Sequence, residues 1–294
     1  MSKYLSMNTV AILIVAVVFL GAMGLVFTWV KELPDRILNK LREWFGLPIE
    51  DLCVMLHLDE VSGNYTGAKI EDSSGYNNDG IIEDGNHNNA DGDQPPVWAM
   101  GTDAFLGTSA LIFKCEPNAC DDYVTIKENP DHPGRLSPKR GITIDLWVKL
   151  KGDPDCDNID DNNWRYILSK GDNGPYQLIL QDDWTIVFKV KVNNNVYELR
   201  SKQHLRWRTW THVATTYDNS TGEMMIYINA YQDVRDTFTP GEIDSNNEDL
   251  IIGGRNFDHC PNGRGVPPVI LDDIRVYNTA LSPFEIVAHF QAVY

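Results

Sequence analysis

Residues 142–150 read ITIDLWVKL, and this stretch decides the fold class. Its aliphatic side chains fall on every second position, at Ile142, Ile144, Leu146, Val148 and Leu150. Polar or aromatic residues fill the positions between them, at Thr143, Asp145, Trp147 and Lys149. Successive side chains of a strand point to opposite faces, so the alternation predicts a half-buried β-strand.

Similar short runs recur through residues 51–294, with Gly, Asn and Asp between them. They are CVMLHL (53–58), YVTI (123–126), YQLIL (176–180), WTIVFKVKV (184–192), THVATTYD (211–218), EMMIYINA (223–230), LIIGG (250–254) and VILDDIRVY (269–277). One late segment, 282–290, has helix signals: Ser282 can cap it, Pro283 takes the first position and Glu285 the third. We predict one all-β antiparallel jelly-roll sandwich with a short C-terminal helix. The length of residues 51–294 is common for a single domain of this kind.

The N-terminal part has a different pattern. Residues 8–30 carry no charge, and about 20 apolar residues span a bilayer, so they predict a transmembrane helix behind a tail of residues 1–7. Residues 31–50 predict an amphipathic stem helix, with Ile37, Leu38, Leu41, Trp44 and Phe45 on one face. We therefore expect a membrane-anchored chain.

Two signals disagree about its orientation. Basic residues follow the span, and the positive-inside rule would place them in the cytoplasm: Lys31, Arg36, Lys40 and Arg42. The acidic body, with its cysteines and Asn/Asp-rich loops, favours the outside, and we expect the globular domain at the cell surface. The net charge of -17, from 25 Lys+Arg against 42 Asp+Glu, argues against nucleic acid as a partner, because such binding needs cations that neutralise phosphates.

Several segments, taken in order, resemble the laminin-G-like jelly-roll family of concanavalin-A-like lectin folds. They are LHLDE (56–60) with DSSGYNNDG (72–80), then ITIDLWVKL (142–150), WTHVATTYDNSTGEMMIYINA (210–230) and ILDDIRVYNTALSPFEI (270–286). The resemblance covers residues 51–294. It departs at Tyr76, where the family usually has Asn, and at Ala230, where it usually has Gly in a tight turn.

Members of this family often bind a structural Ca²⁺ near the DSSG loop. The resemblance makes Asp72 and Asn78 ligands, with Asp272 and Asp59 approaching from neighbouring strands. Carboxylate, amide and carbonyl oxygens are what Ca²⁺ requires. The alternative is a turn whose side chains bond only its own backbone, without a metal.

The cysteines have no zinc-finger spacing. Outside the cytoplasm, Cys115 could pair with Cys120 and Cys156 with Cys260, which leaves Cys53 over. Other pairings, or five reduced thiols, fit the sequence as well.

Aromatic residues beside polar turns suggest a carbohydrate ligand. Trp164, Tyr176 and Trp184 lie next to Asn/Asp-rich loops, where stacking and hydrogen-bonding groups can meet a sugar. No catalytic motif is present: the carboxylates Glu242, Asp244 and Glu248 have the wrong spacing for glycosidases of this fold. We do not expect an enzyme, although a hydrolase with unrecognised residues stays open.

We predict a membrane-anchored, surface-displayed binding domain for a polysaccharide or glycoprotein, acting in adhesion or envelope attachment. The alternative is the structural subunit of a pilin-like filament, self-associating through its N-terminal helices. The basic-Gly cleavage motif of such subunits is missing before residue 8.

Overall fold

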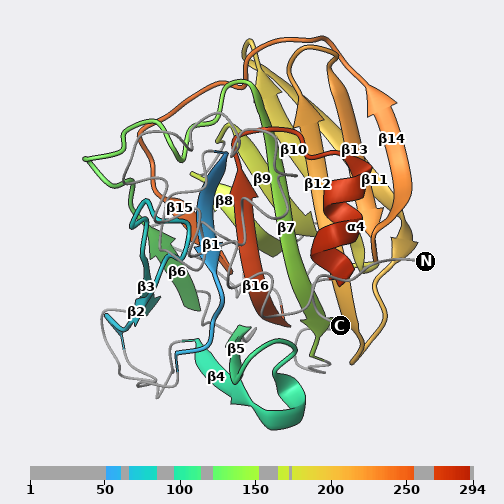
Figure 1. Cartoon of the computed structure of the whole chain (residues 1–294). Coiled ribbons are helices and arrows are strands. Elements are labelled where there is room, and N and C mark those ends of the chain that lie inside the picture. Colours follow the sequence, from blue (N-terminus) through green and yellow to red (C-terminus); the bar gives the residue numbers. More distant parts are fainter. Residues whose placement is uncertain are drawn as a thin grey trace, which may run out of the picture. The chain divides into compact units, whose positions relative to one another are not determined.

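A computed structural model describes residues 51–60, 66–84, 96–113, 122–151, 165–171, 174–254 and 268–291. The chain divides into two compact units, Met1–Ile49 and Glu50–Tyr294, and the described residues belong to the second. This unit is an antiparallel β-sandwich with a short C-terminal helix (Figure 1), as predicted.

Within the described residues, each layer of the sandwich is an eight-stranded sheet. Sheet A has the order β14-β13-β12-β7-β16-β5-β4, and β1 also pairs with β16. Its strands are β1 (Leu52–Leu56), β4 (Val97–Met100), β5 (Ser109–Phe113), β7 (Gly141–Leu150), β12 (Trp210–Asp218), β13 (Glu223–Ile228), β14 (Tyr231–Thr237) and β16 (Val269–Tyr277).

Sheet B has the order β11-β10-β9-β8-β15-β6-β3-β2. Its strands are β2 (Lys69–Ile70), β3 (Gly80–Asp84), β6 (Asp122–Ile126), β8 (Arg165–Lys170), β9 (Tyr176–Leu180), β10 (Thr185–Val192), β11 (Asn195–His204) and β15 (Leu250–Ile252). The 3₁₀ turn η1 (Gly101–Asp103) follows β4. The strand order is non-sequential, so residues far apart in the chain become neighbours.

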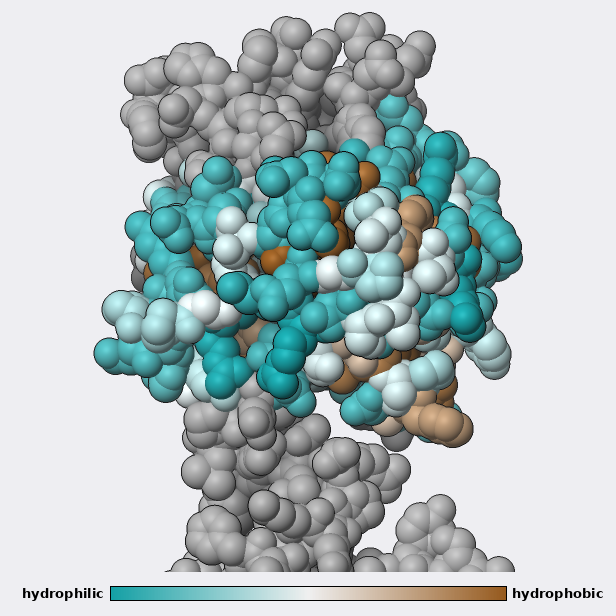
Figure 2. Space-filling model, turned by 90° about the horizontal axis from the view of Figure 1, so that it is seen from above, coloured by the Kyte–Doolittle hydropathy of each residue, from teal (hydrophilic) through white to brown (hydrophobic). Residues whose placement is uncertain are grey.

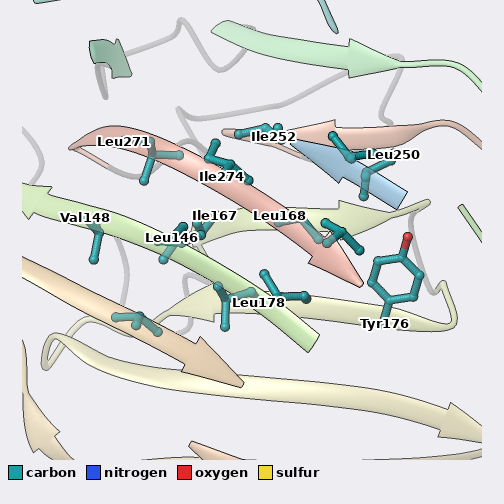
Figure 3. Close-up of a cluster of buried hydrophobic side chains, with 14 of the residues drawn as sticks. Leu146, Val148, Ile167, Leu168, Tyr176, Leu178, Leu250, Ile252, Leu271 and Ile274 are labelled. Atoms are coloured by element: carbon teal, nitrogen blue, oxygen red, sulfur yellow. The ribbon is translucent and has the colours of Figure 1, made fainter. Parts of the chain in front are cut away.

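The aliphatic faces of the two sheets form one core. Figure 3 shows side chains of β7, β8, β9, β15 and β16 converging on the same space, among them Leu146, Ile167, Leu178, Leu250 and Leu271. Each of these is fully buried. Burial of a Leu or Ile side chain stabilises the fold by about 1.5–3 kcal/mol, so the alternation in β7 directly supplies folding energy.

The prediction that β7 is only half-buried is wrong. Its opposite face is also buried at Thr143, Asp145 and Trp147. Helix α4 (Pro283–Gln291) lies on sheet A next to β7 (Figure 1). It contacts this face of β7 through Phe290, whose ring stacks on Trp147 with the centroids 5.5 Å apart. The ring of Phe105, just after η1, has its centroid 3.8 Å from that of Trp147.

Helix α4 begins as the sequence predicts. The backbone N–H of Ser282 donates to Glu285 Oε2 at 2.7 Å, and Ser282 Oγ accepts from the Glu285 N–H at 3.4 Å. This reciprocal pair is a capping box, which satisfies N–H groups that have no partner inside the helix. The cap fixes where α4 starts and therefore which residues it lays on sheet A.

A buried ionic network lies between α4 and sheet A. Asp145 of β7 accepts from Arg275 Nη1 at 3.1 Å and lies 3.1 Å from His212 Nε2 and 3.2 Å from His289 Nδ1. His289 belongs to α4, and its Nε2 is 3.3 Å from the hydroxyl of Tyr277. Burial raises the pKa of Asp145, but the two histidines outweigh it and hold that pKa well below its usual range.

Candidate functional site

The turn between β9 and β10, residues 181–184, positions Trp184 at one end of the sandwich. The N–H of Trp184 donates to the carbonyl of Gln181 at 2.9 Å, and Trp184 has φ 65. Asp183 stabilises the turn, because its Oδ1 accepts from the hydroxyl of Thr185 at 2.6 Å and from the Thr185 N–H at 3.2 Å. Two consecutive aspartates favour such a turn, since their side chains bond nearby backbone groups.

Trp207 meets Trp184 at this end. Their rings are edge to face, with centroids 4.4 Å apart. Trp184 packs against the core, whereas Trp207 exposes 41% of its surface. The guanidinium of Arg165 lies 5.4 Å over the ring of Trp184, and the backbone of Trp207 bridges to Leu150 of β7. An exposed indole is therefore supported from below by a second aromatic ring.

Polar and ionic side chains lie next to the turn that carries Trp184. Asp183 forms an ion pair with Arg200 of β11, and its carbonyl is 2.5 Å from His204 Nδ1. Burial raises the pKa of Asp183, but hydrogen bonds from Thr185 and Arg200 outweigh this and lower it. The carboxylate is therefore charged at neutral pH. We call Trp184, Trp207, Asp183, Arg200 and His204 the tryptophan surface.

The sequence predicted Trp184 as a ligand contact but not the polar residues Asp183, Arg200 and His204 beside it. Arg200 and His204 reach the surface because β10 pairs with β11, with Thr185 opposite His204 and Val187 opposite Arg200. The two runs of residues read as strands, but their register cannot be read from their composition. A hairpin signal at Asn193–Asn194 was the available clue.

The position of Tyr176 differs from the prediction that it contacts a ligand. It is fully buried in the core, and its hydroxyl donates to the carbonyl of Leu136 at 2.9 Å. Burial raises the pKa of this hydroxyl well above its usual value. The prediction that Tyr176 contacts a ligand is wrong, because β9 directs its ring between the sheets. Trp164 lies outside the described residues, so its role stays a prediction.

The residues predicted to bind calcium fall into two pairs. Asp72 and Asn78 form the first, in the DSSG turn. Asp72 Oδ1 accepts from the N–H groups of Met55 and Ser74, each at 2.9 Å, while Oδ2 accepts from Ser74 Oγ at 2.6 Å and Asn78 N at 2.8 Å. The Asn78 amide donates to the carbonyl of Cys53 at 3.0 Å. Both carboxylate oxygens of Asp72 are thus occupied by the protein itself.

Asp59 and Asp272 form the second pair, on either side of residues 105–109. Asp272 Oδ2 accepts from the N–H groups of Phe105 at 3.0 Å and Leu106 at 2.8 Å. Its Oδ1 is buried and has no hydrogen-bond partner among the described residues. Asp59 Oδ1 accepts from the N–H of Thr108 at 2.6 Å. Each carboxylate therefore keeps one oxygen that no described protein group uses.

The charge and backbone of this second pair suit a cation. Burial, followed by repulsion from Asp273 and Asp59, raises the pKa of Asp272 to about 7, which a neighbouring cation would reverse. Gly107 lies at φ 62, and a Cβ there would be 2.0 Å from Asp59 Oδ1, so the loop closely follows that carboxylate. In the described part of the chain, no three His, Cys, Asp or Glu side chains gather as a metal site would need. Asp59 and Asp272 fit a calcium ion only with backbone or solvent oxygens.

Other predictions fall outside the described residues. These are the pairs Cys115–Cys120 and Cys156–Cys260 and the membrane segment 8–30. Cys53 is a free, buried thiol, and burial raises its pKa to about 12. Among the residues that are described, no helix is both long enough and apolar enough to cross a bilayer.

Solved structures share the fold. The binding domain of Paraclostridial Mosquitocidal Protein 1 is 16% identical, with a TM-score of 0.59 over 83% of this chain and 52% of that one. The receptor-binding domain of botulinum neurotoxin C/D mosaic serotype is 14% identical, with a TM-score of 0.55 over 83% and 51%. A structure of botulinum neurotoxin type C, which depends on interaction with two ganglioside molecules to enter cells, is 12% identical, with 0.56 over 83% and 52%. The chain spans about half the length of these proteins.

Sequence comparison identifies the family. No curated protein sequence matches the chain. A family model described as the concanavalin A-like lectin/glucanases superfamily matches residues 118–287, more than half of the chain. The match includes β7, β12 and β16, whose motifs carried the resemblance. The chain therefore belongs to the concanavalin A-like lectin/glucanases superfamily.

Proposed function

We propose that the chain is a binding domain for glycans or glycoproteins and that the tryptophan surface is its contact. One observation carries this proposal: Trp207 is 41% exposed and rests on the ring of Trp184, whose turn also carries Asp183 with its partners Arg200 and His204. Sugars have apolar C–H faces and polar edges, so a supported indole beside hydrogen-bonding groups matches both.

The polar groups of the tryptophan surface include both hydrogen-bond donors and acceptors for a sugar. Arg200 and His204 are exposed and supply donors to sugar hydroxyls, while Asp183 supplies acceptors. The ion pair between Asp183 and Arg200 holds both groups before a ligand arrives, which reduces the entropy lost on binding. The solved relatives named as binding or receptor-binding domains support a binding role, although their shared fold alone does not fix the function.

A calcium ion at Asp59 and Asp272 is part of this proposal. The ion would neutralise the carboxylates on both sides of residues 105–109 and fix that loop. The support is the buried, unpartnered Oδ1 of Asp272. Asp72 and Asn78 stabilise their own turn and are not ligands in this proposal, because their oxygens are already engaged.

The uncharged segment 8–30 would hold the domain at a membrane, on the outer surface. Single sugar sites on shallow surfaces bind in the micromolar to millimolar range, about 4–8 kcal/mol. Many copies on one membrane supply avidity without any new contact. Display of many copies on a membrane would therefore allow adhesion even though each tryptophan surface binds its glycan weakly.

A glycan array with the full-length chain, displayed multivalently, tests the proposal. We expect binding to some glycans and a loss of about tenfold or more in Trp207→Ala, since buried aromatic contacts dominate binding energies. Tyr231→Ala is the matched control, because Tyr231 is an exposed aromatic residue, at 77%, that begins β14 and is not part of the tryptophan surface. Unchanged binding in Trp207→Ala, an equal loss in the control, or no glycan bound at all would each refute the proposal.

A further inference from the structure

Two depressions adjoin at the other end of the sandwich. β10 starts beside the tryptophan surface at Thr185 and ends at Val192, roughly 23 Å away at about 3.3 Å per residue. One depression near Val192 has a volume of about 390 Å³ and the next about 470 Å³, and both are lined by Lys139 and Ser245. We call them together the rim groove. Figure 2 looks onto this end and shows mostly hydrophilic residues at its surface.

Backbone contacts hold the walls of the rim groove. Asn193 and Asn194 form the β10–β11 turn at φ 52 and φ 64, in the left-handed region that Asn tolerates. Val192 pairs with Ile243, and the buried side chain of Ile243 anchors that wall to the core. The N–H of Asn194 donates to Asp244 Oδ2 at 3.0 Å. Lining side chains therefore project from fixed positions.

The positive charges of the rim groove are less engaged than its negative ones. Arg140 and Lys191 have no side-chain hydrogen bond or ion pair among the described residues, and Lys139 lies 3.9 Å from Glu242. By contrast, Glu128 accepts from a backbone N–H at 3.1 Å, and Asp244 is engaged as above. The cations are available to a ligand, whereas two of the carboxylates serve the protein's own backbone.

Amide groups line the same walls, at Asn246, Asn247 and Asn278. The Asn246 Nδ2 donates to the carbonyl of Lys170 at 3.1 Å, which fixes the orientation of its amide. Its Oδ1 is buried without a partner among the described residues. The exposed amide of Asn247 and the half-buried amide of Asn278 offer both donors and acceptors, so the wall is suited to a polyhydroxylated molecule rather than to a bare anion.

We propose that the rim groove binds a carboxylate-bearing sugar residue of an acidic glycan. One carboxylate of the glycan pairs with Arg140 in the first depression and another with Lys191 in the adjoining one, and the sugar hydroxyls bond the amide wall. The site is separate from the tryptophan surface, although both assign glycan binding to the domain. The net charge of -17 does not prevent this, because screening over about 8 Å at physiological salt limits a ligand to nearby charges. In the lining, the cations Lys139, Arg140 and Lys191 face the carboxylates of Glu128, Glu242 and Asp244, two of which accept backbone N–H groups.

Calorimetry with the full-length chain tests the proposal, with trigalacturonate as the ligand and its methyl ester as the uncharged control. The charged trisaccharide should bind about tenfold tighter or more, as expected for a charge-assisted hydrogen bond. Arg140→Gln and Lys191→Gln should each remove most of this difference. Lys202→Gln, an exposed lysine of β11 outside the groove, should leave it unchanged.

Trp207→Ala separates this proposal from the preceding one. Trigalacturonate should bind this variant as it binds the parent, even where neutral glycans are lost. Equal affinity for acid and ester, no binding of either, or groove variants that bind like the parent would overturn the rim-groove assignment. So would loss of trigalacturonate binding in Trp207→Ala.

Discussion

At the scale of single residues, Ala230 shows how this chain departs from its family. Asn229 and Ala230 form the tight β13–β14 turn at φ 52 and φ 65. Ala230 stands where the family usually has Gly, which put this turn in doubt, yet the turn is present. Positive φ at both positions is the requirement of a type I′ hairpin turn, and an alanine there is strained by its Cβ.

Ala230→Gly should therefore stabilise the protein, by about 1 kcal/mol, because the strain disappears and the turn is already formed. Urea unfolding of the parent and variant measures the difference. Ala214→Gly in the middle of β12, where φ is not positive, is the opposite control and should destabilise. A variant at Ala230 that is less stable than the parent would contradict the strain argument.

At the scale of elements, α4 is attached to sheet A through a charged contact as well as an apolar one. Asp145 bonds Arg275 of β16, His212 of β12 and His289 of α4, so one carboxylate connects three elements to β7. Removing one partner of an ion pair this deeply buried strongly destabilises the folded protein, because the other charge stays buried without compensation.

The network predicts a pH dependence of stability. The pKa of Asp145 is lower in the folded protein than in the unfolded chain, where Asp titrates at about 3.9. Its contribution is present above that pH and is lost as pH falls toward the folded pKa, so stability should drop below about pH 4.

Asp145→Asn should be less stable than the parent at pH 6, by about 3 kcal/mol, and the difference should shrink as the pH falls below 4. Denaturant midpoints at several pH values measure this. Asp131→Asn, at an exposed loop position, is the control and should match the parent. A constant difference between Asp145→Asn and the parent at every pH would show that the carboxylate charge is not involved.

At the scale of the whole molecule, calcium would connect strands from distant parts of the chain. Asp59 follows β1, Asp272 lies in β16, and residues 105–109 lead into β5. An ion bound only by the folded state stabilises it by about 3 kcal/mol at 100 times its dissociation constant, which is roughly 5–10 °C in melting temperature.

Calcium should thus raise the melting temperature of the parent relative to EDTA, and Asp272→Asn should abolish the rise. The amide keeps an oxygen for the N–H groups of Phe105 and Leu106 but loses the charge. Asp72→Asn should be destabilised equally with and without calcium, because its bonds are internal to the turn. A melting temperature of the parent that is the same in calcium and in EDTA would exclude this site.

The sequence by itself determined the features that depend on local pattern. Alternation in ITIDLWVKL produces β7, the Ser282 and Glu285 pair starts α4, and the ordered motifs identify the family. These follow from side-chain periodicity and hydrogen bonds between residues three positions apart, which a linear sequence displays.

Only the tertiary structure decided which side chains share a surface. It buried Tyr176, placed Trp207 on Trp184, and separated Asp72 from the partly unoccupied carboxylate of Asp272. It also assembled the rim groove from segments about 100 residues apart, among them residues 139–140 and 242–247. The physical reason is that strand order and register set these contacts, and a shift of one residue moves every side chain to the other face.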